Sequence, residues 1–225
     1  MDDNKTIYFC NKTIDPSTIK SASKWKDLNP DYNIVIYDNT MCEDFLLKEY
    51  SELYKNIFLF IKDGPIKADF WRLCVLYKYG GIYSDIDNVP LVALKEFIED
   101  NIDFVTCSSY WVESGFSFNP NFIVAKKNNP ILKKCIYWYV YKYIHKLNYS
   151  YWQWSIMNCF TNVIKLQNYN KDDGIYIDIE NNLRVQIIKE CSGDHHYDAY
   201  NIYNNLRVFN NRSLNWDANS HSFIK

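Results

Sequence analysis

The sequence predicts a single α/β domain, and three observations lead to that prediction. The chain has 225 residues, of which 48% are hydrophobic, which is enough for one sizeable core. Short runs rich in β-branched and aromatic residues alternate with longer runs of helical periodicity. Near the middle, residues 66–90 join a helix pattern to a strand pattern through Gly80-Gly81. We expect the rest of the chain to be organised around that junction.

The segment before the junction alternates strand and helix. A β-rich run at 5–11 and the run at 32–37 predict strands, and the runs at 19–28 and 39–54 predict helices. The turn at Asp63-Gly64-Pro65 then leads into the central helix, with Pro65 suited to its first turn.

The central helix is predicted from Ile66 to the glycine pair, because apolar residues recur there at helical spacing. Asp69 and Arg72 are three residues apart and therefore share one helical face. Gly80 is suited to end the helix, because a left-handed conformation costs glycine little.

A strand is predicted at residues 82–87, directly after the glycine pair. Alternation puts Tyr83, Asp85 and Asp87 on one face of that strand. Two carboxylates ~6–7 Å apart along a strand form a chelate of hard oxygens, which suits Mg²⁺ or Mn²⁺. The alternative is a solvated strand end whose aspartates have no function, since Asp-x-Asp is common by chance.

After the junction the pattern continues to the C-terminus. We expect strands at 103–107, 175–179 and 185–189, and helices at 94–98, 130–147 and 151–166. The helix at 130–147 is rich in aromatic residues, which suits a membrane surface or a core, and its continuous apolar stripe favours the core.

The composition excludes several classes of function. A net charge of −2 and scattered lysines and arginines argue against a nucleic-acid surface. The seven cysteines contain no C-x-x-C pair, which favours reduced thiols. No apolar run approaches the ~20 residues of a transmembrane helix, and the polar N-terminus does not resemble a signal peptide.

One combination of residues resembles a known family. Lys67-Ala68-Asp69, Arg72 and Tyr79-Gly80-Gly81-Ile82-Tyr83-x-Asp85-x-Asp87 are similar to the signature of the family 32 glycosyltransferases, the proteins with a DXD sugar-binding region. That family includes initiating α-mannosyltransferases and capsular transferases, and the large clostridial glucosylating toxins are more distant relatives.

The resemblance implies a GT-A-type nucleotide-binding fold, with a mainly parallel central sheet flanked by helices. It implies a retaining hexosyltransferase that depends on Mn²⁺ or Mg²⁺. Such an enzyme moves a sugar from a nucleotide-sugar donor (a UDP-sugar or GDP-mannose) to a hydroxyl of a glycan or protein. By the same resemblance Asp85 and Asp87 bind the metal and the donor diphosphate, Asp69 contacts ribose or sugar hydroxyls, Arg72 holds the donor, and Tyr83 lines the pocket.

The two ends of the chain depart from the family pattern. The family's usual tryptophan at the end of the first strand, which contacts the donor, is absent, and Phe9 or Cys10 lies in its place. Residues 190–225 are expected to close over the donor site, with His196 as a third metal ligand. Secretory relatives usually carry a membrane anchor, so its absence here implies a cytoplasmic or virus-encoded enzyme.

Two alternatives remain open from the sequence. Residues 82–89 also fit the Asp-x-Asp-x-[Thr/Val] motif of phosphatases that form an aspartyl phosphate, although that motif normally ends a first strand. The other alternative is a catalytically degenerate protein that binds nucleotide sugars without turnover.

Overall fold

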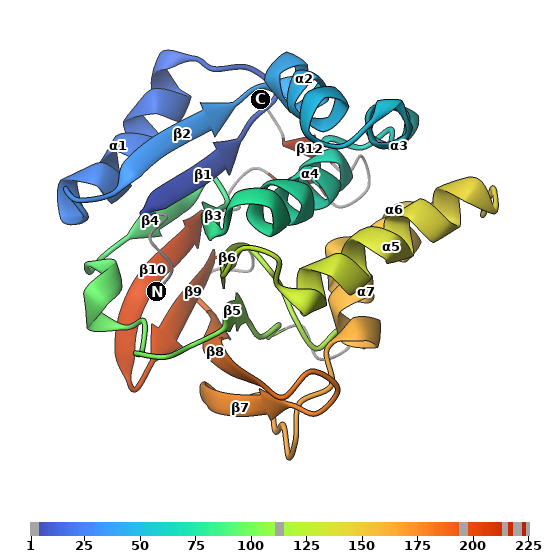
Figure 1. The fold of residues 1–225 in the computed structure, drawn as a ribbon. Coiled ribbons are helices and arrows are strands. Elements are labelled where there is room, and N and C mark those ends of the chain that lie inside the picture. The colour runs from blue at the N-terminus through green and yellow to red at the C-terminus, as the bar shows by residue number, and fades with distance from the viewer. Residues whose placement is uncertain (1–4, 111–114, 194–197, 213–215, 218–221, 224–225) are drawn as a thin grey trace.

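The structure is a computed structural model that describes residues 5–110, 115–193, 198–212, 216–217 and 222–223. A curled sheet forms its centre and helices cover it (Figure 1). The strands are β1 (Thr6–Cys10), β2 (Asn33–Tyr37), β3 (Gly81–Ser84), β4 (Asn88–Pro90), β5 (Phe104–Cys107), β6 (Phe122–Ala125), β7 (Gly174–Asp178), β8 (Leu183–Ser192), β9 (Asp198–Tyr203) and β10 (Leu206–Arg212), with a separate pair β11 (Trp216–Asp217) and β12 (Ser222–Phe223). The helices are α1 (Pro16–Leu28), α2 (Asn39–Glu49), α3 (Glu52–Phe60), α4 (Gly64–Tyr79), the 3₁₀ turn η1 (Leu94–Glu96), α5 (Pro130–Ile144), α6 (Tyr151–Trp154) and α7 (Ile156–Val163).

The α/β class is confirmed, but the sheet is mixed and the prediction of a mainly parallel sheet was wrong. The order is β2-β1-β3-β6-β5-β8-β9-β10-β4, with β7 also paired to β8. Among the described strands, only the pairs β1–β2, β1–β3 and β5–β8 are parallel. The antiparallel pairs include β7–β8 and β9–β10, whose strands follow each other closely in the chain. The turn from β9 to β10 has Asn204 and Asn205 at φ 49° and 64°, a left-handed pair that matches the twist of a tight hairpin.

The sheet curls so that two distant parts of the chain meet. β4 follows β3 closely in sequence but pairs with β10, at the opposite end of the strand order. The curled end lies against α1, where the indole N–H of Trp25 donates to the carbonyl of Asn88 at 3.3 Å. This closure fixes both ends of the segment between β3 and β4.

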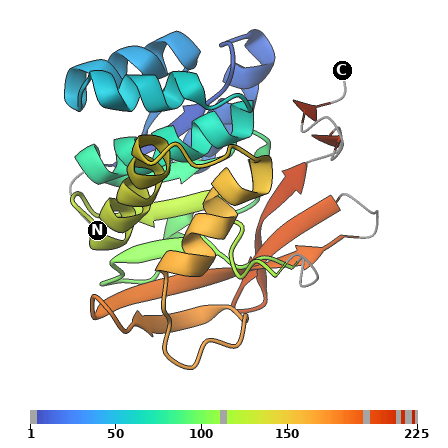
Figure 2. The ribbon, with the colours of Figure 1, turned by 90° about the vertical axis from the view of Figure 1, so that its right-hand side faces the viewer.

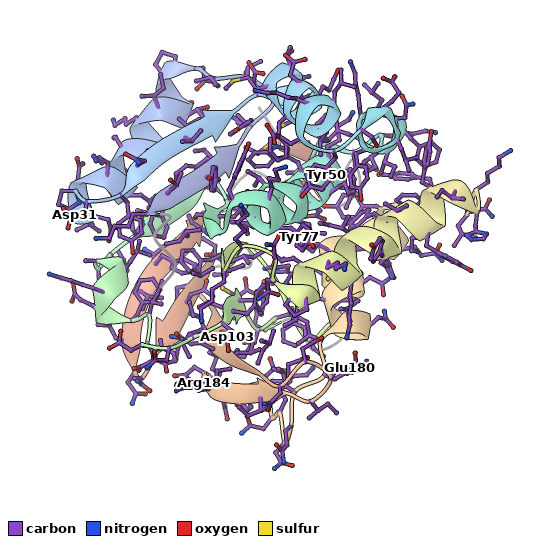
Figure 3. All side chains as sticks on the ribbon, viewed as in Figure 1. Asp31, Tyr50, Tyr77, Asp103, Glu180 and Arg184 are labelled. Atoms are coloured by element: carbon purple, nitrogen blue, oxygen red, sulfur yellow. The ribbon has the colours of Figure 1, made fainter. Side chains whose placement is uncertain are left out.

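Apolar cores fill both faces of the sheet. The larger core surrounds α4 and includes α2, α3, α5 and α7; Figure 2 shows α5 and α7 in front of the central strands. Tyr50 contributes to it at the position labelled in Figure 3, and its hydroxyl donates to the carbonyl of Cys74 at 2.7 Å. The smaller core lies under α1, where Trp25 stacks on Phe122 with ring centroids 5.6 Å apart.

The helix α4 ends where the sequence predicts. Gly80 has φ 69°, and a Cβ at this position would lie 2.8 Å from the backbone nitrogen of Lys127. Only glycine combines this conformation with so close an approach of another backbone. β3 therefore starts immediately after the helix, and the acidic pair is held at a fixed distance from Asp69 and Arg72.

Three expectations about element boundaries were wrong. The helix expected at 39–54 is two helices broken before Glu52, and the one expected at 151–166 is broken at Ser155. The strand expected to reach Asp87 ends at Ser84, because residues 85–87 have no neighbouring strand. They form a turn closed by the N–H of Asn88 and the carbonyl of Asp85 at 3.1 Å.

The segment 190–225, which was expected to close over a donor site, is described only in part. Much of it belongs to the sheet, as the end of β8 and as β9 and β10. His196 lies outside the described residues.

Candidate active site

The site starts from a buried ion pair on α4. Nη2 of Arg72 lies 3.0 Å from Oδ1 of Asp69, and both side chains are less than a tenth exposed. Their i, i+3 spacing places them on one face of the helix, as predicted. A charged pair removed from water in this way is costly unless its remaining polar atoms are also satisfied.

The turn after β3 adds a second carboxylate to this pair. Oδ1 of Asp85 lies 3.2 Å from Nη2 of Arg72 and accepts a hydrogen bond of 2.7 Å from the hydroxyl of Tyr83. The guanidinium group of Arg72 lies 4.1 Å from the ring centroid of Tyr83. Arg72 thus bridges the helix and the turn, so that three predicted residues are brought together.

Backbone carbonyls also bind the guanidinium group of Arg72. Its Nη1 donates to the carbonyl of Pro120 at 2.8 Å and its Nε to the carbonyl of Ala68 at 3.4 Å. Burial disfavours the cation, but Asp85, Tyr83 and Asp69 outweigh that effect and raise the pKa of Arg72. The guanidinium group is therefore a fixed positive charge.

Asp69 is fixed from a distant part of the chain. Its Oδ2 accepts a hydrogen bond of 3.0 Å from the backbone N–H of Ile156, the first residue of α7. A helix N-terminus favours a negative charge. Burial nevertheless raises the pKa of Asp69 to about 6, because it outweighs Arg72 and this N–H.

Asp85 and Asp87 provide oxygens that no other described residue occupies. Arg72 and Tyr83 both contact Oδ1 of Asp85, no described residue bonds its Oδ2, and the side chain is 32% exposed. Asp87 is half-buried and has no ion pair with a described residue. Burial, followed by the charge of Asp85, raises the pKa of Asp87 to about 7.

This donor set fits a hard divalent cation. Two carboxylates close together repel each other, and a cation between them removes that cost. No group of three or more His, Cys, Asp or Glu side chains among the described residues could hold a metal by itself. Two carboxylates do not complete the coordination of such a cation, so its further ligands would come from outside the described side chains.

A cavity of about 120 Å³ opens beside these groups. Asp69, Arg72 and Asp85 form its charged wall, and Asn119 lies next to them. On the other side Trp152 pairs with Phe116 at a ring centroid distance of 5.8 Å. The cavity thus combines a charged wall with an aromatic one, which suits a ligand with hydroxyls and apolar ring faces.

Two residues predicted for the donor pocket lie elsewhere. Tyr83 is 1% exposed and supports Asp85 and Arg72 from behind, so it does not line the cavity. Phe9 is fully buried in the smaller core. Side chains alternate along β1, so Tyr8 and Cys10 face the larger core, whereas Phe9 faces α1.

The sequence analysis did not identify several groups at the site. Pro120 and Ile156 contribute through backbone atoms, which no side-chain pattern reveals. Asparagine is common in turns, so Asn119 gave no functional signal in the sequence, and its position at the cavity is visible only in the structure.

Comparison with known proteins identifies the central segment. Residues 15–104 match the model of the glycosyltransferase sugar-binding region containing a DXD motif. Over this segment the chain is similar to that family. The matched residues include Asp69, Arg72, Asp85 and Asp87, whereas Asn119 and Ile156 lie beyond them.

The curated relatives match part of the chain. An initiation-specific alpha-1,6-mannosyltransferase of Candida albicans is 31% identical over 85 residues, which cover 37% of this chain and 22% of that protein. A mannosyl phosphorylinositol ceramide synthase of Saccharomyces cerevisiae is 34% identical over 71 residues, 31% of this chain and 18% of that protein. The chain thus spans about a fifth of the length of these relatives.

A solved structure supports the fold over a longer region. The structure titled PaToxG Glycosyltransferase superposes with a TM-score of 0.55 and 22% identity, covering 71% of this chain and 68% of that one. Among the described residues, no helix is both long enough and apolar enough to span a membrane.

Proposed function

We propose that the chain is a divalent-metal-dependent, retaining glycosyltransferase that moves a sugar from a nucleotide-sugar donor to a hydroxyl group of an acceptor. The observation that carries the proposal is the buried assembly of Asp69, Arg72 and Asp85 at the wall of a cavity. These residues lie in the segment matched by the DXD family. The names of the curated relatives favour mannose as the transferred sugar.

The chain's own groups suit the roles that glycosyl transfer requires. Mn²⁺ or Mg²⁺ held by Asp85 and Asp87 would neutralise charge on the departing nucleoside diphosphate. Arg72 keeps Asp85 in place and leaves its Oδ2 directed away from the protein contacts of Oδ1. Asp69 offers a carboxylate to ribose or sugar hydroxyls at the same wall.

The stereochemical part of the proposal rests on the family resemblance. In a front-face displacement the leaving phosphate assists the acceptor hydroxyl, and the sugar passes through an oxocarbenium-like state. The acceptor would approach from the aromatic side of the cavity, where Trp152 and Tyr151 offer flat surfaces to a sugar ring. An assay of the product's anomeric configuration that showed inversion would contradict this mechanism.

The first test is release of nucleoside diphosphate from UDP-glucose, UDP-galactose and GDP-mannose, with and without Mn²⁺. We expect one donor to be hydrolysed only with the metal, and Asp85→Asn and Asp87→Asn to lower that rate at least about 100-fold. Asp31→Asn, at an exposed aspartate in the turn between α1 and β2, is the matched control and should retain the rate. Metal-dependent binding of a nucleotide without turnover, with or without acceptor sugars, would favour a degenerate sugar-binding protein instead.

A further inference from the structure

A buried carboxylate lies directly behind the cavity wall. Glu190, on β8, is 3% exposed, and within the described residues no basic side chain forms an ion pair with it. Its Oε1 accepts hydrogen bonds from the side-chain amides of Asn119 at 2.6 Å and Asn211 at 3.0 Å. Its Oε2 accepts one from the backbone N–H of Tyr110 at 3.3 Å. Neutral N–H donors from three segments of the chain thus bind this carboxylate, where a buried carboxylate is ordinarily paired with a cationic side chain.

This arrangement determines which way the amide of Asn119 points. Oε1 of Glu190 accepts the hydrogen bond, so Asn119 turns its NH₂ group toward Glu190. The backbone of Asn119 is also fixed: its N–H donates to the carbonyl of Cys107 at 3.1 Å, and its carbonyl accepts from the N–H of Asn121 at 2.8 Å. The amide oxygen of Asn119 is consequently on the side away from Glu190.

Asn119 lines the cavity together with Asp69, Arg72 and Asp85. Four of the five N–H donors of Arg72 are already used, by the two carboxylates and by two backbone carbonyls. This wall therefore offers acceptors: the carboxylate oxygens and the amide oxygen of Asn119. The ligand group that fits it is a hydrogen-bond donor, such as a sugar hydroxyl, rather than a phosphate.

We propose that Asn119 is a specificity-determining residue whose amide oxygen accepts a hydrogen bond from one hydroxyl of the donor sugar, and that Glu190 is the positioning residue that fixes this orientation. The inference rests on the proposed glycosyl transfer. Without Glu190, the amide of Asn119 could rotate and present its NH₂ group to the cavity. A sugar hydroxyl would then meet a donor instead of an acceptor, and the selectivity for that hydroxyl would fall.

The test compares Asn119→Ala with the wild type on the donor that the wild type uses and on its monodeoxy analogues. We expect the substitution to lower kcat/KM for the complete donor about tenfold. On the one analogue that lacks the recognised hydroxyl, it should change kcat/KM less than about twofold, because the hydrogen bond is already absent. Asn162→Ala, on the exposed face of α7, is the matched control and should leave every ratio unchanged.

Glu190 is tested by two further variants. Glu190→Gln retains a carbonyl oxygen that can accept from Asn119, so the preference for the complete donor should persist. Glu190→Leu removes the acceptor, so the preference should fall as in Asn119→Ala, and combining the two substitutions should lower it no further. If the leucine variant does not fold, Asn119→Ala and Glu190→Gln still decide the matter.

Several results would overturn the inference. An equal loss on every donor, or no loss on any, would show that Asn119 does not recognise a hydroxyl. A loss of preference in Glu190→Gln would show that Glu190 does not act through the orientation of Asn119. Calorimetric binding of UDP and GDP to the wild type separates failure of this inference from failure of the proposed glycosyl transfer. If the wild type neither binds nor turns over any nucleotide sugar, both the inference and the proposed function are overturned.

Discussion

Replacing Glu190 by glutamine should change the pH dependence of stability in a direction that the structure fixes. Burial raises the pKa of Glu190 to about 7 from its ordinary value of 4.5; the N–H of Tyr110 and the amides of Asn119 and Asn211 only partly offset it, and Asp85 adds to it. Between pH 4.5 and about pH 7, the folded chain therefore keeps a proton on Glu190 that the unfolded chain has released. In that window the wild type loses stability as the pH rises.

The size of the effect follows from the same two pKa values. One pKa unit corresponds to about 1.4 kcal/mol, so Glu190 costs the folded chain about 3 kcal/mol once the pH exceeds 7. Because part of this cost is already present at pH 5, the change between pH 5 and pH 8 is about 2–3 kcal/mol. Glutamine does not titrate, so the stability of Glu190→Gln relative to the wild type should rise by this amount over that range. Any cost from the lost hydrogen bond to Tyr110 shifts all values equally.

The assay is urea unfolding of both chains at pH 5, 6, 7 and 8, followed by tryptophan fluorescence. The other titrating groups, including Asp69 and Asp87, are present in both chains and cancel in the difference. Glu180→Gln is the matched control, because Glu180 is exposed and its pKa is lowered by its hydrogen bond with Lys134. That variant should show a small change of opposite sign. A stability difference for Glu190→Gln that stays constant, or falls as the pH rises, would refute the assigned cost of burying this carboxylate.

Two further predictions concern the fixed parts of the site. Arg72→Lys should lower nucleoside diphosphate release at least about 100-fold and destabilise the fold by about 3 kcal/mol, because one ammonium group cannot replace the bonds from Nε, Nη1 and Nη2. The release assay measures the first effect and calorimetry the second. Arg184→Lys, at an exposed arginine, is the control and should change neither. Gly80→Ala should lower the unfolding free energy by more than about 2 kcal/mol, because the left-handed conformation adds to the approach of Lys127. Gly115→Ala is the control: Gly115 has φ 73°, but a Cβ there would meet no other atom, so urea unfolding should show only the cost of the left-handed conformation. An equal loss of unfolding free energy in both variants would contradict the role of the close approach of Lys127 to Gly80.

The parts of the fold that sequence reasoning predicted depend on local signals. Gly80 ends α4, as the conformational freedom of glycine predicts. The ion pair of Asp69 and Arg72 follows from helical spacing alone. In each of these cases the interacting atoms lie within one or two turns of the same helix.

The parts that were mispredicted depend on partners that are distant in sequence. Alternation continues through Asp85, but β3 ends at Ser84 because no neighbouring strand continues beside it. The direction of the later strands is set by pairings such as Asn88 with Asn211, which the sequence does not specify. Glu190 gave no signal, since a single glutamate in a β-rich run is ordinarily exposed.

The division between predicted and missed residues follows a physical division within the site. The matched segment supplies the charged groups, and residues beyond position 104 supply neutral groups that fix them: the carbonyl of Pro120 holds Arg72, and the N–H of Ile156 holds Asp69. Charged groups at fixed local spacing suit a chemistry shared by a whole family. Neutral groups such as the amide of Asn119 can change without removing that chemistry, and they are therefore the natural positions at which the choice of sugar is set. Substitutions of Asp69, Arg72, Asp85 or Asp87 should thus abolish turnover of every donor, whereas substitution of Asn119 should first alter which donor is preferred.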